Sequence, residues 1–385
     1  ELYNDEWRHS NGAWIRTEVW ACTHPGCPEK AIRYAFEDAS VDHGFGEGSY
    51  ATIFVAAMQS AAFIFDDLRT LIDIGLSKIP EDCRTARSIK IVLNNFDKGI
   101  DWKTTREQLV EDSMDLGWFQ APMNVAFAVL GMLYGGCDFK KSMIIAINCG
   151  DDTDCTGATV GSTLGIMYGT RCIPADWREH IGDEIVTLSI IKGHGYFPAS
   201  CKELTDCVMS LLSATMRTPN PVLAKHGPQF ILTDGESDFG KLTPESFMGR
   251  DFAEGMFHRS RYSFTIESVY ATVLVEYEHE PIIAPNSELK MKITCTLNGN
   301  MAEQKLFNLK FHLPEGWRAE GRKHVHASMI SGSHGMRIYS LDHGFSTTEI
   351  TLVAGENVEA RNRGVIEITT PERPTPILVP LMILG

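Results

Sequence analysis

The stretch Asn148–Gly169, NCGDDTDCTGATVGSTLGIMYG, joins a cluster of acids to an apolar helix that carries several glycines. Three carboxylates, Asp151, Asp152 and Asp154, fall within four residues and follow the apolar run MIIAI. Like charges this close repel one another, and their burial is costly unless a cation is present. A helix N-cap needs only one such residue. The stretch therefore favours metal binding over simple capping.

Two other interpretations of this stretch stay open at this stage. Asp152 and Asp154 fall on the first and third positions of an EF-hand loop, but Thr163 stands where the closing Glu is required. The glycines recur at every fourth position and line one helix face, at a cost of about 1 kcal/mol each relative to alanine. Close approach of a helix or a ligand explains that face, and tight helix packing without function explains it as well.

Helical spacing of apolar residues extends from Pro28 to about Leu212. The stretch Tyr50–Leu76 is apolar nearly all round, which predicts a helix or a pair of helices in the middle of a bundle. Pro28 begins an earlier helix at its first turn. The further predicted helices are Arg84–Phe96, Thr104–Leu116, Pro122–Leu133, Lys140–Ile147, Cys155–Tyr168, Trp177–Ile185 and Cys201–Met216.

The character of the sequence changes at Arg217–Pro221, where two prolines and an asparagine end the last helix. From Tyr262 onward, alternating and β-branched runs are separated by turn residues, which is typical of a sandwich or barrel. We therefore predict a helical domain at 1–217, an irregular connector at 218–261 packed between the domains, and a β-sandwich at 262–385. The segment around LPEGWRAEG resembles the immunoglobulin-type appendages of carbohydrate-active and related bacterial enzymes, and this resemblance implies an immunoglobulin-like sandwich. The predicted strands lie in YSFTIESVYATVLVEYEH, LKMKITCTLN, LFNLKFHL, GMRIYSL, TTEITLVA, GVIEITT and ILVPLMIL.

Composition limits the partners of the protein. A net charge of −15 and a pI near 5.3 disfavour binding to a nucleic-acid backbone, which needs a basic face. No run approaches the roughly 20 apolar residues that span a bilayer, so we expect no membrane partner. The ten cysteines are scattered and read as reduced core residues, which favours a soluble, cytoplasmic protein. Cys22, His24 and Cys27 lack a fourth zinc ligand.

Three motifs together resemble the ADP-ribosylglycohydrolase family. GDDTDCTGATVGSTLG, preceded by DFKKSMIIAINC, resembles the second metal-binding motif of that family. Upstream, and in the same order as in the family, SNGAWIR at Ser10–Arg16 resembles a glycine-containing loop, and DASVDHGFGEGSYATIFVAAM at Asp38–Met58 resembles a helix with a His and a glycine-rich turn. The resemblance covers roughly residues 5 to 215 and does not include the β region.

The resemblance implies an orthogonal helical bundle with two adjacent divalent ions, Mg²⁺ or Mn²⁺, that hydrolyses an N- or O-glycosidic bond of ADP-ribose. Asp152 and Asp154 then become metal ligands and catalytic residues. The residues expected to contact an ADP-ribosylated substrate are Asn11, Gly12, His43, Gly44, Gly46 and Gly48. The residues taken alone favour simpler interpretations. His43 would be a histidine that caps or joins two helices, and Asn11–Gly12 would form an ordinary turn.

Two departures from the family pattern affect the metal site. Cys155 stands where the family supplies a hydroxyl oxygen to the metal, and sulfur is a poor ligand for Mg²⁺. Thr156 is rotated by about 100° around the helix and is not expected to replace it. The first metal motif of the family would lie upstream of Glu1, and neither the acids at 5–6 nor Asp66–Asp67 reads as a substitute.

These departures keep other functions open. One is a non-catalytic ADP-ribose or nucleotide binder of the same fold, and another is a glycoside hydrolase that acts on carbohydrate, suggested by the β region. We expect the chain from Glu1 to show little hydrolase activity on its own. We also expect the apolar stretch Tyr50–Leu76 to lack neighbours, and therefore to expose an apolar groove or to cause self-association.

Overall fold

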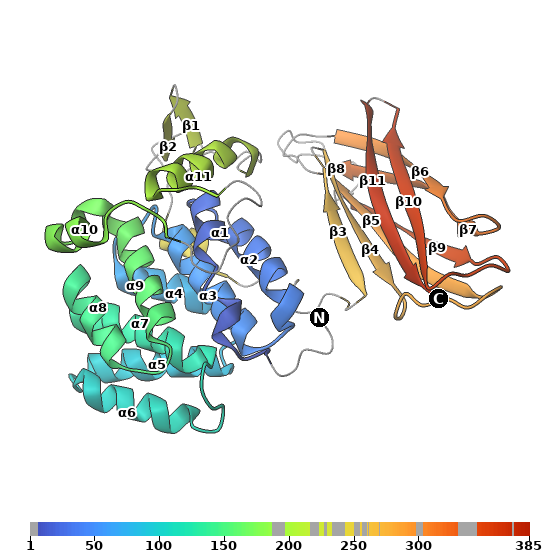
Figure 1. Cartoon of the computed structure of the whole chain (residues 1–385). Helices are drawn as coiled ribbons and strands as arrows, with labels where there is room; N and C mark the ends of the chain where they lie inside the picture. The colour runs from blue at the N-terminus through green and yellow to red at the C-terminus, as the bar shows by residue number, and fades with distance from the viewer. Residues whose placement is uncertain are drawn as a thin grey trace, which may run out of the picture. The chain divides into compact units, whose positions relative to one another are not determined.

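The computed structural model divides the chain into two compact units, Glu1–Phe257 and His258–Gly385, each with its own hydrophobic core. The first unit is helical and the second is built from strands (Figure 1). The structure describes residues 7–186, 197–215, 223–226, 229–232, 243–249, 255, 260, 262–268, 270–297, 303–329, 345–371 and 373–385. None of the helices in these ranges is both long enough and apolar enough to cross a membrane.

Each predicted helix has a described counterpart within a few residues, whereas the short helix α1 was not predicted. The long apolar stretch forms a pair, α3 and α4, because Asp67 caps α4 through a bond from Thr70 N to its carboxylate. Asp67 therefore lies at the start of α4, where capping accounts for its carboxylate. The elements are η1 (Asn11–Ala13), α1 (Glu18–Thr23), α2 (Pro28–His43), α3 (Glu47–Ala61), α4 (Leu68–Ser77), α5 (Arg84–Asp97), α6 (Trp102–Ser113), α7 (Ala121–Gly135), α8 (Phe139–Asn148), α9 (Thr153–Tyr168), η2 (Thr170–Cys172), α10 (Ala175–Ile181) and α11 (Cys201–Thr215).

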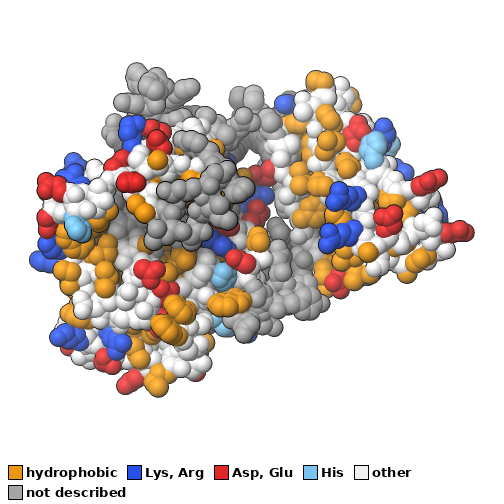
Figure 2. Space-filling model, in the orientation of Figure 1, with side chains coloured by type: hydrophobic (Ala, Val, Ile, Leu, Met, Phe, Trp, Pro, Cys, Tyr) orange, Lys and Arg blue, Asp and Glu red, His pale blue; other side chains and the backbone are white. Residues whose placement is uncertain are grey.

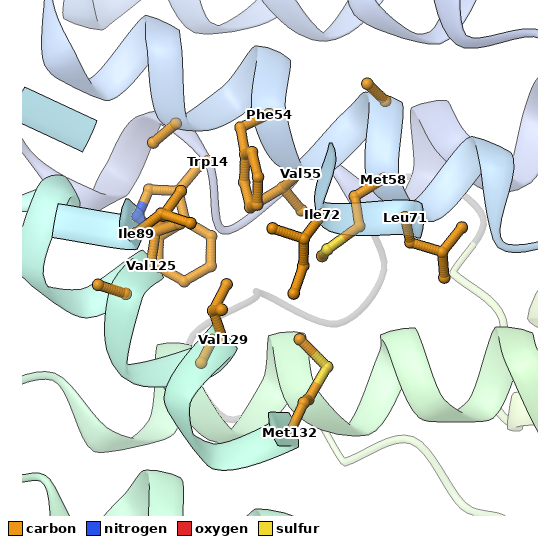
Figure 3. Close-up of a cluster of buried hydrophobic side chains, with 14 of the residues drawn as sticks. Trp14, Phe54, Val55, Met58, Leu71, Ile72, Ile89, Val125, Val129 and Met132 are labelled. Atoms are coloured by element: carbon orange, nitrogen blue, oxygen red, sulfur yellow. The ribbon is translucent and has the colours of Figure 1, made fainter. Parts of the chain in front are cut away.

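Helices α3 and α7 form the centre of the helical unit. Both are apolar on nearly every face, and α3 is buried along almost its whole length. Trp14 and Phe54 pack with Ile72, Ile89 and Val129 in this core (Figure 3). The expectation that Tyr50–Leu76 exposes an apolar groove was therefore wrong, because α2, α4, α5 and α7 surround α3 within the described part of the chain.

The second unit contains two antiparallel sheets that enclose one core. One sheet has the strand order β11-β10-β6-β8 and the other has the order β3-β4-β5-β9-β7. Burial alternates along β5 and β11, as expected for strands with one face on a core. The strands are β3 (Ser263–Glu267), β4 (Ala271–Tyr277), β5 (Glu288–Leu297), β6 (Glu303–His312), β7 (Arg318–Gly321), β8 (His324–Met329), β9 (Phe345–Val353), β10 (Arg361–Thr370) and β11 (Arg373–Leu384).

The structure confirms the predicted β region with two differences. β7 and β8 were missed, because RAEG and HVHASM are short and polar. The predicted strand in GMRIYSL lies outside the described residues. On the face of this unit seen in Figure 2, apolar side chains gather beside basic ones, and the exposed apolar residues of the unit include Leu378, Met382 and Leu384 of the edge strand β11.

The connector is more regular than predicted. Its described parts contain a two-stranded hairpin, β1 (Leu223–His226) with β2 (Gln229–Leu232), and the single-turn helix α12 (Pro244–Phe247). Phe247 packs edge-on against Phe65, with ring centroids 5.1 Å apart, and belongs to the core of the helical unit. These described parts are regular, in contrast to the predicted irregular connector, and α12 belongs to the helical unit.

Candidate metal and nucleotide site

A tight reversal of the chain between α8 and α9 positions the acid cluster. Gly150 has φ +84° and Asp151 has φ +58°, and both values lie in the left-handed region. Glycine adopts this conformation without strain, and aspartate tolerates it better than most residues. The reversal places Asp152 at the N-cap position of α9. Its side chain makes no capping hydrogen bond, so helix capping does not account for this carboxylate.

Asp152 is fixed by two asparagines from distant parts of the chain. Asn11 Nδ2 donates to Asp152 Oδ2 at 2.8 Å, and the backbone N–H of Asp152 donates to Asn124 Oδ1 at 3.3 Å. Trp14 Nε1 donates to Asn11 Oδ1 at 3.1 Å. Because an indole nitrogen only donates, it fixes the Asn11 amide with its NH₂ group toward Asp152. Asp152 is 8% exposed.

The three acids of the cluster have different surroundings. Asp151 Oδ1 accepts from Asn124 Nδ2 at 2.9 Å and from Phe119 N at 3.3 Å, which makes it part of the loop scaffold. Asp152, Asp154 and Cys155 can bring one ligand atom each to within 4.8 Å of one another. Within the described ranges, these three residues form the one such group of His, Cys, Asp and Glu side chains.

The donors in this group suit a hard divalent cation better than a soft one. Burial, together with the neighbouring carboxylates of Asp152 and Asp154, raises the pKa of the Cys155 thiol to about 12, so the thiol is protonated at neutral pH. The neutral thiol leaves two carboxylates as the strong donors, and carboxylate oxygens are preferred by Mg²⁺ and Mn²⁺. Thr156 Oγ1 donates to Asp152 O at 2.9 Å, so that hydroxyl already serves the helix backbone.

The Asn11–Gly12 loop connects this cluster to His43. A Cβ atom on Gly12 would lie only 2.4 Å from His43 Nε2, so the glycine backbone packs directly against the imidazole edge. Asn11 contacts Asp152 while Gly12 contacts His43. The structure thereby brings together four of the predicted site residues, although η1, α2 and α9 are far apart in the sequence.

The remaining predicted glycines have structural explanations. Gly44 follows α2 with φ +59° and ends that helix. Cβ atoms on Gly46 and Gly48 would lie 2.8 Å from Arg8 O and 2.9 Å from Ser10 O, respectively. Both glycines therefore let the start of α3 approach the loop before η1. Contact of these three glycines with ADP-ribose stays a prediction.

The glycine face of α9 is mainly a helix-packing face. Cβ atoms on Gly157 and Gly161 would lie 3.3 Å and 3.1 Å from Met143 of α8, whereas one on Gly165 would meet nothing within 4 Å. Gly169 follows the helix with φ +70° and ends it. Tight packing against α8 explains the first two glycines, and chain reversal explains the last.

Sequence reasoning missed an exposed aromatic pair beside the cluster. The rings of Trp118 and Phe119 stack with centroids 4.5 Å apart and planes 5° apart, and Trp118 is 64% exposed. Phe119 has φ +60°, donates its N–H to Asp151, and accepts the N–H of Asn11 at 2.8 Å. The only signal in the sequence was two adjacent aromatic residues in a polar loop.

A half-buried acid next to α9, Glu18, was also missed. Glu18 Oε1 accepts from Thr159 Oγ1 at 3.3 Å and from Ser162 Oγ at 3.4 Å. Burial raises the pKa of the Glu18 carboxyl, while these hydrogen bonds oppose the rise. Gln59 Nε2 donates to Ser162 Oγ at 2.9 Å, so polar contacts continue along α9 beyond the acid cluster.

One comparison with known proteins matches the helical unit to a family model. A family model described as ADP-ribosylglycohydrolase matches residues 3–205, more than half of the chain. No curated protein matches the chain. A solved structure described as the crystal structure of a FixG-related protein from Vibrio parahaemolyticus is 11% identical, with a TM-score of 0.23, and the match covers 30% of this chain and 95% of that chain.

Proposed function

Since the chain belongs to the ADP-ribosylglycohydrolase family, we propose that its helical unit uses a divalent cation to hydrolyse an N- or O-glycosidic bond of ADP-ribose. The observation that carries this proposal is the position of Asn11–Gly12 between two chemically different groups. The Asn11 amide contacts the Asp152 carboxylate, and the Gly12 backbone contacts the His43 ring. A substrate that spans the loop would meet a cation at one end and an imidazole at the other.

Asp152 and Asp154 would hold the cation. Their proximity is unfavourable without a positive charge, and the helix N-terminus offsets only part of the repulsion. A bound Mg²⁺ or Mn²⁺ would supply that charge and polarise oxygens of the substrate and of water. Asn11 holds the Asp152 carboxylate in place, as hydrogen-bonded neighbours of metal ligands commonly do.

The Trp118–Phe119 stack would contribute a flat apolar surface at the rim of the site. Aromatic side chains stack on nucleobases with a gain of about 1–3 kcal/mol per base. Both rings are exposed, and Phe119 is tied by its backbone to Asp151 and Asn11, so the surface is held at a fixed position beside the cluster. We assign it to the adenine end of ADP-ribose.

Cys155 favours one alternative function, a non-catalytic binder of ADP-ribose. Its protonated sulfur stands where a third oxygen would strengthen cation binding, so the site offers a weaker donor set than two carboxylates and a hydroxyl. A binder would need the loop, His43 and the aromatic stack, but would not need a firmly held cation.

Calorimetry with Asp152→Asn and the matched control Asp151→Asn tests the proposal. We expect Mn²⁺ binding to weaken at least about tenfold in Asp152→Asn, because a charged ligand is lost, and to change little in Asp151→Asn. Titration with ADP-ribose, with and without Mn²⁺, then separates the two functions. Cation-dependent release of ADP-ribose from an ADP-ribosylated peptide supports the hydrolase. ADP-ribose binding without cation dependence or turnover supports the binder, and absence of ADP-ribose binding refutes both.

A further inference from the structure

We propose that Asp42, held by Arg16, is a positioning residue that keeps the His43 ring in its Nδ1–H tautomer, so that Nε2 accepts a hydrogen bond from a sugar hydroxyl. This inference rests on the proposed function, because it assigns a ligand group to His43. It adds the chemistry of the contact and the residues that set it. Neither residue belongs to the acid cluster on α9.

The geometry of the pair orients the ring. His43 Nδ1 lies 2.7 Å from Asp42 Oδ1, and the ring is 7% exposed. The opposite edge of the ring faces Gly12, and the absence of a side chain on Gly12 leaves room for the ring. Nδ1 therefore points to the carboxylate while Nε2 lies beside the loop that also contacts Asp152. Within the described part of the chain, Nε2 makes no hydrogen bond to protein, which leaves it for a ligand.

Arg16 keeps Asp42 ionised. The guanidinium donates to both carboxylate oxygens of Asp42, with the contact to Oδ2 at 3.1 Å, and its Nε lies 3.2 Å from Asp38 Oδ2. These contacts with Arg16, followed by the one with His43, lower the pKa of the Asp42 carboxyl to about 2. An ionised carboxylate only accepts hydrogen bonds, so the proton between Asp42 and His43 belongs to Nδ1.

The proposed tautomer determines what Nε2 can bind. With Nδ1 donating to Asp42, Nε2 of this tautomer carries a lone pair. A lone pair accepts from a hydroxyl and is repelled by phosphate oxygens, so the group recognised at this position is a ribose hydroxyl rather than the pyrophosphate.

Nitrogen NMR of the full chain with ¹⁵N-labelled histidine tests the tautomer without any ligand. The His43 signals are assigned by their loss in His43→Gln. We expect the parent protein to show the Nδ1–H form near neutral pH. Asn at position 42 can donate as well as accept, so Asp42→Asn should give a mixture of tautomers or the Nε2–H form. Asp38→Asn is the control, because Asp38 touches Arg16 without touching His43.

The ligand measurement separates this inference from the proposed function. We expect ADP-ribose to bind about tenfold more weakly to Asp42→Asn than to the parent or to Asp38→Asn. An unchanged Nδ1–H signal in a folded Asp42→Asn protein would overturn the positioning role. A changed tautomer with unchanged ADP-ribose affinity would overturn the contact with a hydroxyl. No ADP-ribose binding by the parent, with the tautomer as expected, would refute the proposed function and leave the orienting role of Asp42 intact.

Discussion

The two units bury different kinds of side chain. The core of the β unit is almost entirely apolar, and its buried polar residues within the described ranges are Lys305, Thr348, Asn362 and Thr370. The helical unit buries many more, among them Asn11, His43, Gln59, Asn124, Asp152, Thr156 and Thr163. Buried polar groups are costly unless hydrogen-bonded, so such an interior has to be built around specific partners. The helical unit therefore has the polar interior in which the proposed site lies.

Charge follows the same division. Acidic and basic residues nearly balance in the β unit, so almost all of the net charge of −15 lies on the helical unit. Figure 2 shows acidic and basic side chains on the visible faces of both units. An acidic unit attracts cations and repels free anions. A cation bound at Asp152 and Asp154 would reduce the repulsion between this unit and the pyrophosphate of ADP-ribose.

The largest expected effect is a loss of stability that is confined to the β unit. Phe307 of β6 is fully buried in its core, so Phe307→Ala should lower the free energy of unfolding of that unit by about 3–5 kcal/mol. Because the two units have separate cores, Mn²⁺ binding by the helical unit should not change. Calorimetric unfolding combined with Mn²⁺ titration measures both. Loss of Mn²⁺ affinity in this variant would show that the units do not act independently.

Two glycine variants of the helical unit refine this comparison. One tests the cost of adding a methyl group where two helices are in close contact, and the other tests the gain in helix propensity where there is space for it. A Cβ atom on Gly131 of α7 would lie 2.5 Å from Ala146 Cβ and 2.8 Å from Ser142 O. Gly131→Ala should therefore cost about 1–3 kcal/mol. Gly165→Ala meets nothing within 4 Å and should stabilise by up to about 1 kcal/mol. Chemical denaturation measures both, and equal effects of the two variants would contradict the packing explanation.

A smaller effect is expected at Cys155, where the polar interior departs from the family pattern. Cys155→Ser replaces a protonated sulfur by a hydroxyl oxygen of similar shape, beside Asp152 and Asp154. Mg²⁺ affinity should rise by about tenfold or less, and by more than Mn²⁺ affinity, because Mg²⁺ has the stronger preference for oxygen. Calorimetric titration of both ions measures the ratio. A fall in both affinities would mean that the sulfur itself serves the site.

Sequence patterns predicted the regular part of this molecule better than its contacts. Apolar periodicity placed α5 and α9 to within two residues, because helices bury a stripe that repeats along the chain. The same patterns missed β7, where a short polar strand has no such stripe. They also could not show that Asp151 supports a loop while Asp152 faces Asn11, because the partners of the two acids lie 27 and 141 residues away along the chain.

The smallest expected effect concerns the pH dependence of the Arg16–Asp42 pair. The folded pKa of Asp42 is about 2, below its usual range near 4, so the ionised carboxylate stabilises the folded state above about pH 4. This contribution should be lost as the pH falls from about 4 towards 2. The Asp42 side chain is 49% exposed, so solvent screening limits the contribution to below about 1 kcal/mol. Asp42→Asn should therefore be slightly less stable than the parent at neutral pH, and the difference should shrink below about pH 4. Urea unfolding of both proteins between neutral and acidic pH measures this difference, with Asp97→Asn as the control for an ion pair between two other helices. A difference that stays constant down to pH 3 would mean that Asp42 contributes to stability by packing rather than by its charge.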